Sequence, residues 1–260
     1  MTICIGIKVA EGLVLAADSL ATISNDEGGI VQQFQHSQKV SQIGDYPAGT
    51  FTWGVGSIAS LTIDSVIMEF SETLAPYSTI RGHEGFTIAE LARRLFDFVN
   101  ERYTAYYQAA NRDPEPLGIA VGGYSSDAHF GDLYGFFLPF DTEPVNYFPD
   151  LPDGTPIFNV KWFGQSEPLV RLMYGADPNL LEETLTPQYT DENQMIEAAR
   201  ALYGKYTYPV LFNLMPLQDA IDFAVYLVGV VNGKFRFTVG QPLCGGDIDV
   251  AIISRKGLSG

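Results

Sequence analysis

The second residue of the chain carries two groups that together could perform nucleophilic chemistry. Thr2 follows Met1, and an initiator before a residue as small as threonine is commonly removed, so no propeptide would be needed to expose it. The freed α-amine has a reference pKa of about 8 and can accept the hydroxyl proton near neutral pH, directly or through a water molecule. Thr2 would then supply both nucleophile and base, whereas a retained Met1 would block the amine. By itself, a threonine at this position is typical of an ordinary strand.

The segment after Thr2 is expected to form a β-hairpin that holds it in place. β-Branched residues are enriched in the flanking segments 2–9 and 13–18. The residues between them, 10–12, end in a glycine, which tolerates the positive φ of a three-residue hairpin turn. The nucleophile would therefore lie at the end of a regular strand.

A three-residue turn also determines which residues of the hairpin lie opposite one another. Val9 would face Leu13, Thr2 would face Leu20, and Asp18 would lie diagonally beside Thr2 on the same face of the sheet. Taken alone, Asp18 would be interpreted as a strand-end carboxylate facing water. The apolar face would carry Ile3, Ile5, Ile7, Leu13 and Leu15, and the polar face Thr2, Lys8 and Asp18.

Strands and helices continue to the end of the chain, with no internal repeat or linker to divide it. Strand pairs separated by helix pairs predict two mainly antiparallel sheets face to face, each covered outside by helices, in one domain spanning 1–260. Strands are expected at 38–43, 50–55, 117–124, 129–138, 157–163 and 248–253, and helices over 58–70, from Thr87, within 168–215, and from 216 to a stop at 232–233.

Composition excludes several classes of partner. The chain has 260 residues, of which 46% are hydrophobic and 18% charged, enough to bury one large core. Its formal net charge of −16 would repel nucleic acid, whose binding relies on lysine and arginine. No apolar run is long enough to span a bilayer, and the first residues lack a basic leader. We expect no nucleic acid, no membrane, and a cytoplasmic setting.

Metal ions and cofactors are not indicated. His36, His83 and His129 have no partners at metal-ligand spacing, and the glycine-rich segments lack the Lys-Ser/Thr ending of a phosphate loop. Cys4 and Cys244 could form one bridge, but a chain with an adequate core has no need of it, so both are interpreted as small buried residues.

Seven short motifs, spread over most of the chain, point together to one family. They are Thr2-Ile3, residues 12–22, Lys39-Val40, and residues 54–57, 121–124, 164–168 and 245–253. In combination they resemble the β-type subunits of the 20S proteasome and its bacterial relatives. The resemblance implies an α+β fold, the four-layer α/β/β/α sandwich of the N-terminal-nucleophile (Ntn) hydrolases.

The resemblance also implies a role for each matched residue. Thr2 would be the nucleophile, Asp18 would pair with Lys39 and fix it, and Gly56 would stabilise the oxyanion through its backbone N–H. The charge of Lys39 would disfavour the ammonium form of the nearby amine, which keeps the base neutral. Taken singly, Lys39 is also consistent with a solvated strand lysine and Gly56 with a turn glycine.

Some positions depart from the family pattern. The serine that supports the terminal amine is replaced by Gln165 or displaced to Ser166. Gln241 and Cys244 stand where an aspartate and a serine are expected before the double glycine, and Leu20 replaces the usual arginine. These changes bear on the surroundings of the nucleophile, and hence on catalytic efficiency, more than on the fold.

The function that the resemblance implies is that of a threonine-type endopeptidase without a cofactor. Its expected partners are a peptide or unfolded protein substrate, further copies of the chain in a homo-oligomeric ring, and an ATP-dependent unfoldase. Two alternatives remain open. One is a noncatalytic scaffold subunit of a proteasome-like assembly, and the other is an Ntn amidohydrolase that acts on a small-molecule amide.

Overall fold

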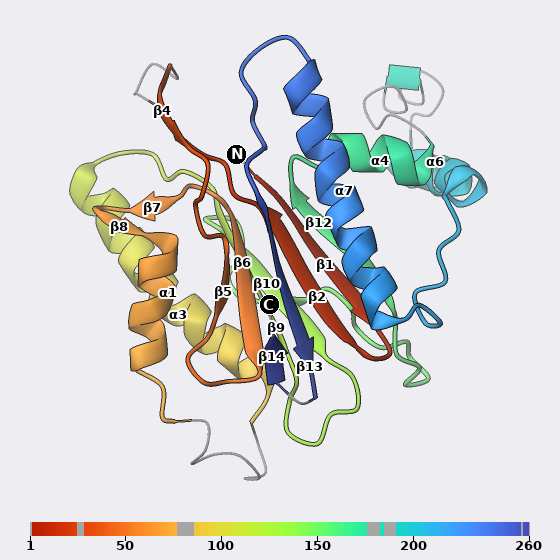
Figure 1. Ribbon diagram of the computed structural model, residues 1–260, viewed down its shortest axis with the longest axis horizontal. Coiled ribbons are helices and arrows are strands. Elements are labelled where there is room, and N and C mark those ends of the chain that lie inside the picture. The colour runs from red at the N-terminus through yellow and green to blue at the C-terminus, as the bar shows by residue number, and fades with distance from the viewer. Residues whose placement is uncertain are drawn as a thin grey trace.

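The computed structural model describes residues 2–24, 29–76, 86–175, 183–184, 191–255 and 257–259. Two five-stranded sheets form its centre, and helices flank them on either side (Figure 1). The first sheet has the order β12-β1-β2-β13-β14 and the second has the order β11-β10-β9-β6-β5. Every strand pair in both sheets is antiparallel.

The strand bounds agree closely with the expected segments. The first sheet contains β12 (Asn159–Gly164), β1 (Ile3–Val9), β2 (Gly12–Asp18), β13 (Ile248–Ser254) and β14 (Gly257–Ser259). The second sheet contains β11 (Val145–Asn146), β10 (Asp132–Leu138), β9 (Leu117–Gly123), β6 (Ala48–Gly54) and β5 (Val40–Gln42). Two separate two-stranded ribbons are formed by β3 (Ala21–Ser24) with β4 (Ile30–Phe34), and by β7 (Ser57–Ile58) with β8 (Leu61–Thr62).

Of the expected helix starts, the one at Thr87 is confirmed, whereas the helix expected over 58–70 begins only at Ile63 because Ile58 and Leu61 pair in β7 and β8. The described helices are α1 (Ile63–Glu72), α3 (Ile88–Ala110), α4 (Glu167–Tyr174), α6 (Glu192–Tyr206) and α7 (Leu217–Phe237). Thr87 caps α3 by accepting a hydrogen bond from the backbone N–H of Glu90, as the sequence predicts. The expected stop at 232–233 is wrong, because α7 continues to Phe237, whose turn packs Phe235 into the core. Within the predicted helical block 168–215, α4 and α6 confirm helices, and residues 176–182 and 185–190 lie outside the described residues.

Three apolar clusters stabilise this arrangement. One lies between the two sheets and includes Leu15 of β2 and Phe51 of β6. A second joins the inner face of α7 to the first sheet, and a third joins α1 and α3 to the second sheet. Burial of these side chains supplies the main driving force for folding. Among the described residues, no helix is long and apolar enough to cross a membrane.

The predicted four-layer α/β/β/α sandwich of the Ntn-hydrolase type is wrong as a description of this fold. Within the described residues the chain forms four sheets and five helices, and two of those sheets are ribbons that the prediction lacks. The physical reason lies in the connecting segments. Residues 21–24 and 30–34, for which no strand was expected, pair as β3 and β4, and residues 25–28 between them lie outside the described part.

The register of the first hairpin also differs from its prediction by one residue. Val9 lies opposite Gly12 and Cys4 opposite Ala17, so the turn contains two residues instead of three. Gly12 is not the turn glycine: it is the first residue of β2, where an added Cβ would lie 2.9 Å from the carbonyl oxygen of Ile253. Because side chains alternate between faces, this shift moves Leu13 and Leu15 away from Ile3, Ile5 and Ile7 and into the space between the sheets.

Candidate active site

Thr2 is buried at the start of the first strand. Only 4% of its surface is exposed, and its carbonyl oxygen accepts a hydrogen bond of 2.8 Å from the backbone N–H of Gln165. The next residue, Ile3, pairs with Gly164 at the end of β12. Thr2 is therefore held by the turn that leads from β12 into α4.

Gly164 is required for this close approach. Its φ of +83° lies in the region that favours glycine, and a Cβ at this position would lie 2.0 Å from the carbonyl oxygen of Thr2. No side chain can be accommodated at that distance. The glycine thus places the β12–α4 turn directly against the backbone of Thr2.

We expect Gly164→Ala to destabilise the protein strongly and to displace Thr2. The strained φ should cost about 1 kcal/mol and the clash should raise the loss to about 3 kcal/mol or more in urea unfolding. Gly154→Ala is the matched control, because Gly154 has a φ of +81° but nothing within 4 Å of an added Cβ. An equal loss for the two variants would mean that the contact with Thr2 is unimportant.

Asp18 lies at the same open end of the hairpin as Thr2, at the last position of β2, and is fully buried. Its Oδ1 accepts a hydrogen bond of 3.0 Å from the backbone N–H of Ile3, next to Thr2. Its Oδ2 accepts one of 3.0 Å from the backbone N–H of Gly245. A carboxylate with donors on both oxygens is fixed in orientation, and burial makes each of these bonds stronger than it would be in water.

Lys39 completes the arrangement from the second sheet. It stands directly before β5, its side chain is 9% exposed, and its Nζ lies 2.8 Å from Asp18 Oδ1. A second hydrogen bond of 2.8 Å joins Nζ to the carbonyl oxygen of Leu20. These bonds use two of the three ammonium hydrogens. The pair thereby links the two sheets at the end of the strand that carries Thr2.

Sequence reasoning thus named three residues, Thr2, Asp18 and Lys39, that the fold brings to one place. The route differs from the expected one. The diagonal hairpin geometry is wrong because of the changed register, and Asp18 reaches the Thr2 neighbourhood through the N–H of Ile3. Lys8 belongs elsewhere: it is buried with its Nζ 3.7 Å from Asp132 Oδ1, where burial raises the pKa of that carboxyl despite the opposing effect of Lys8.

No described hydrogen bond joins Gly56 or Ser166 to Thr2, Asp18 or Lys39. Gly56 is exposed between β6 and β7, has open space around it, and accepts a hydrogen bond on its carbonyl oxygen from the N–H of Ile63. Ser166 is the N-cap residue of α4, and its side chain makes no capping hydrogen bond. Of the two residues considered as supports for the amine, Gln165 is the one whose backbone bonds Thr2.

The sequence interpretation missed the contribution of the segment before β13. Gly245 donates its N–H to Asp18, and its carbonyl oxygen accepts from the N–H of Leu20. Gly246 has a φ of +75°, and a Cβ there would lie 2.5 Å from Ser19 Oγ. The signal available in the sequence was the place of these two glycines in the motif that precedes the last strand.

The charges of Asp18 and Lys39 act on the thiols of both cysteines, but neither thiol is a competing nucleophile. Burial raises the pKa of the Cys4 thiol well above its ordinary value, and it raises the pKa of Cys244 to about 12, with the Asp18 charge adding to the effect. Both thiols are therefore neutral at pH 7. They are free and occupy different apolar clusters, Cys4 between the sheets and Cys244 under α7, as their interpretation as small buried residues predicts.

Among the residues that the structure describes, no group of three or more histidine, cysteine, aspartate or glutamate side chains is arranged to hold a metal ion. His83 lies outside the described residues. The side chains that the fold brings to this place are those of a buried threonine, a lysine and an aspartate.

Comparison with solved structures shows a fold like that of the ancestral beta-subunits. The chain is similar to Anbu (ancestral beta-subunit) from Yersinia bercovieri, with a TM-score of 0.53 and 14% identity over 99% of this chain and 86% of the other. It is also similar to the chain in a helical assembly of the Anbu complex from Pseudomonas aeruginosa, with a TM-score of 0.52 and 15% identity over 97% of this chain and 81% of the other. No family model and no curated protein matches the sequence.

These similarities correct the family assignment. The resemblance of the motifs to the β-type subunits of the 20S proteasome and its bacterial relatives is wrong at the level of the family, because the similar structures are Anbu proteins, which are proteasome-like but distinct. At 14% and 15% identity the likeness establishes the fold alone. The roles of individual residues must therefore be argued from their own geometry.

Proposed function

We propose that this chain is an oligomer-forming subunit in which Thr2, freed by removal of Met1, hydrolyses peptide bonds in the cytoplasm. The observation that carries the proposal is the buried pair in which Lys39 Nζ lies 2.8 Å from Asp18 Oδ1 while the same oxygen accepts the N–H of Ile3, the residue after Thr2. A buried ion pair is costly to desolvate and is a weak source of stability by itself. Its bond to the N–H of the residue after Thr2 gives it a chemical use once Thr2 is the N-terminus.

In the proposed mechanism, Thr2 Oγ1 attacks the substrate carbonyl carbon while the α-amine of the same residue accepts the hydroxyl proton. The tetrahedral intermediate collapses to an ester on Oγ1, and the leaving amine takes the proton from the α-ammonium. Water, activated by the same amine, then hydrolyses the ester and restores the enzyme. The charge of Lys39 favours the neutral amine. The exposed N–H of Gly56 is the candidate donor to the oxyanion.

A second candidate is a noncatalytic scaffold subunit of a proteasome-like assembly. Two observations favour it. The similar chain from Pseudomonas aeruginosa forms a helical assembly, and the hydrogen bonds described for Ser166 are backbone bonds at the start of α4, with none from its hydroxyl to Thr2. Both candidates require self-association, so they differ only in whether Thr2 becomes the N-terminus and reacts.

Intact-mass measurement of the purified protein, before and after treatment with a peptidyl β-lactone, distinguishes the candidates. The proposal predicts a mass that lacks Met1 and a single covalent adduct that maps to Thr2. Sedimentation of the same sample should show a species larger than one chain. Retention of Met1 in every molecule, with no adduct, would instead establish the scaffold.

A further inference from the structure

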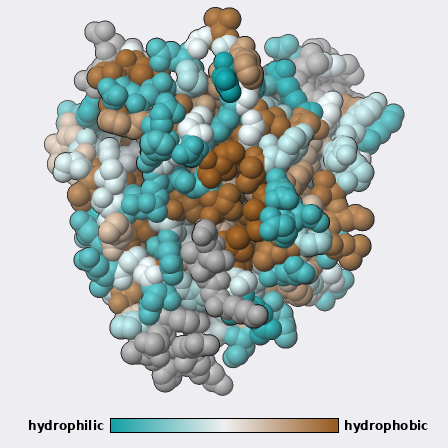
Figure 2. All heavy atoms as spheres, viewed as in Figure 1, coloured by the Kyte–Doolittle hydropathy of each residue, from teal (hydrophilic) through white to brown (hydrophobic). Residues whose placement is uncertain are grey.

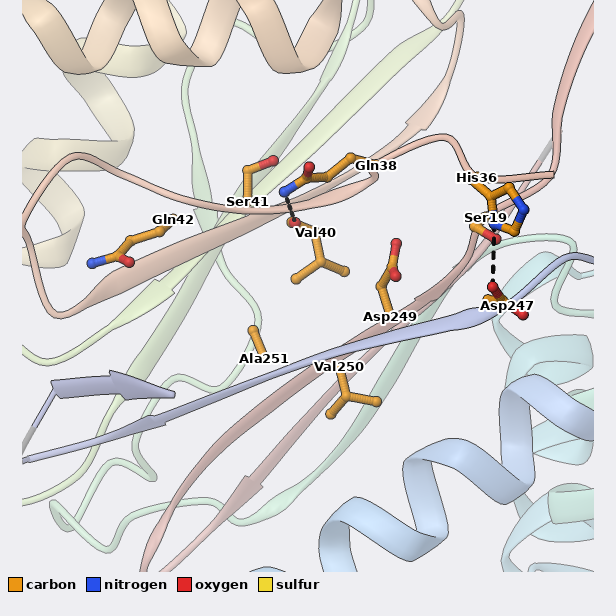
Figure 3. A pocket seen from close by; sticks show the side chains of 10 residues that line it. All are labelled: Ser19, His36, Gln38, Val40, Ser41, Gln42, Asp247, Asp249, Val250 and Ala251. Atoms are coloured by element: carbon orange, nitrogen blue, oxygen red, sulfur yellow. Dashed lines mark hydrogen bonds and ion pairs between the residues drawn. The ribbon is translucent and has the colours of Figure 1, made fainter. Parts of the chain in front are cut away.

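A hollow opens beside the candidate active site, between one edge of each sheet. Its volume is about 460 Å³, and it does not include Thr2. β5 of the second sheet lies along one side and the first half of β13 along the other, as Figure 3 shows. Figure 2 shows apolar side chains gathered over β13 on the same face of the molecule.

The two strands that border the hollow have open outer edges. Residues 248–251 of β13 pair with β2 on one side only, whereas residues 252–254 also pair with β14. β5 is the last strand of its sheet and pairs with β6 alone. No other backbone pairing of residues 248–251 or of β5 occurs within the described part of the chain. Open edges of this kind accept an added strand through main-chain hydrogen bonds.

The side chains at this edge alternate in a way that suits an extended ligand. Asp249 and Ala251 point from β13 towards β5, whereas Val250 points the other way (Figure 3). The carboxylate of Asp249 has no hydrogen bond or ion pair with any described residue. Asp247, two residues earlier, has its Oδ2 3.2 Å from Nδ1 of the exposed His36.

The charge of the hollow selects a cationic side chain. Burial raises the pKa of the Asp249 carboxyl, and repulsion from Asp247 adds to the effect. The charges of Lys39 and His36 oppose this effect, but Lys39 is paired with Asp18 and His36 with Asp247. A lysine or arginine delivered by a ligand would therefore give Asp249 the ion pair that it lacks among the described residues. The chain itself is poor in such residues, with 15 lysines and arginines against 31 aspartates and glutamates, so a basic segment of a partner protein suits the hollow better than a second copy does.

We propose that this hollow binds an extended segment of a partner protein that adds as a strand to the open edge of β13 and places a lysine or arginine against Asp249. This site lies outside the catalytic arrangement and does not depend on the chemistry of Thr2. Main-chain bonds to the strand edge would supply affinity, and Asp249 would supply the preference for a basic residue.

The test uses the full chain carrying Thr2→Ala and a fluorescein-labelled Thr-Val-Lys-Val-Thr peptide, with binding followed by anisotropy. Asp249→Asn should weaken binding by about tenfold, the usual scale for loss of a close charge pair. Asp219→Asn is the matched control, because Asp219 is exposed in the first turn of α7, away from the hollow, and loses the same charge. It should leave binding unchanged.

Two further peptides separate strand addition from simple charge attraction. A peptide with glutamate in place of lysine, and a lysine peptide N-methylated at alternate residues so that it cannot form main-chain bonds, should each bind at least about tenfold more weakly. Tight binding of the methylated peptide would overturn strand addition. Equal binding by Asp249→Asn and the control variant, or absence of binding by the lysine peptide at low salt, would overturn the site itself.

The Asp249→Asn variant is expected to remain folded. A raised carboxyl pKa means that its contribution to stability is fully present below the unfolded-state pKa and is lost as the pH rises through the folded-state value. Because folding disfavours the charged form of this carboxyl, replacing it with a neutral amide should not lower the melting temperature at pH 7. A cooperative melting transition at or above that of the parent protein then assigns any loss of binding to the hollow, and unchanged binding in that folded variant rejects the proposal.

Discussion

Thr2→Ala is expected to reduce peptide hydrolysis to the uncatalysed level, a loss of at least about 10³-fold in kcat. The reason is that alanine keeps the α-amine and the backbone contact with Gln165 but removes the only atom that can form the acyl-enzyme ester. Thr2→Ser should retain measurable activity, since it keeps a hydroxyl on the same carbon. Turnover of a fluorogenic peptide and covalent capture by the β-lactone both report the loss.

The control for this prediction is Thr104→Ala, which removes a hydroxyl from an exposed position on α3. It should change neither turnover nor capture. If Thr2→Ala and the parent protein hydrolyse the peptide equally, Thr2 is not the nucleophile and the activity belongs to another group or to a contaminant. If both are inactive although Met1 has been removed, the scaffold becomes the better account.

How much of the fold the sequence predicts depends on how local each signal is. The start of α3 was predictable because Thr87 and Glu90 act within one helical turn. The hairpin register was not predictable. Residue 12 is a glycine because a side chain there would collide with the backbone of Ile253, more than two hundred residues away in the chain. A tertiary constraint of this kind leaves no mark in the local pattern that reports turn length.

The candidate site was likewise predictable from the sequence only in part. Thr2, Asp18 and Lys39 could be named from motifs, since each is a residue type with an unusual demand on its surroundings. The N–H groups that orient Asp18 come from Ile3 and Gly245, and backbone donors carry no signature of their own. The ribbon β3–β4 escaped prediction because its strands have intermediate or exposed side chains, such as Ile23 and Val31, and lack the apolar alternation of a buried strand.

The second large effect should come from breaking the pair between Asp18 and Lys39. Lys39→Met keeps the length of the side chain but leaves a fully buried carboxylate with only backbone partners. We expect a loss of about 3–5 kcal/mol in urea unfolding. Asp18→Asn and the variant that carries both substitutions complete a double-mutant cycle. Because the two side chains are in direct contact, their coupling energy should exceed about 1 kcal/mol.

An exposed pair on α3 provides the matched cycle. Arg93 and Asp97 are in contact, but their side chains are 55% and 56% exposed, so Arg93→Met with Asp97→Asn should give a coupling of less than about 1 kcal/mol. Similar coupling energies in the two cycles would show that burial does not strengthen the inner pair.

A pH profile separates a structural role of Lys39 from a chemical one. If its charge keeps the α-amine of Thr2 neutral, the rate of β-lactone capture by Lys39→Met should rise to its plateau at a higher pH than in the parent protein, while Lys39→Arg should stay close to the parent profile. A purely structural pair would lower the amount of folded protein and leave the shape of the profile unchanged. Since only the folded fraction reacts, normalising capture to that fraction makes the two outcomes distinguishable, and an unmoved profile would remove Lys39 from the proposed mechanism.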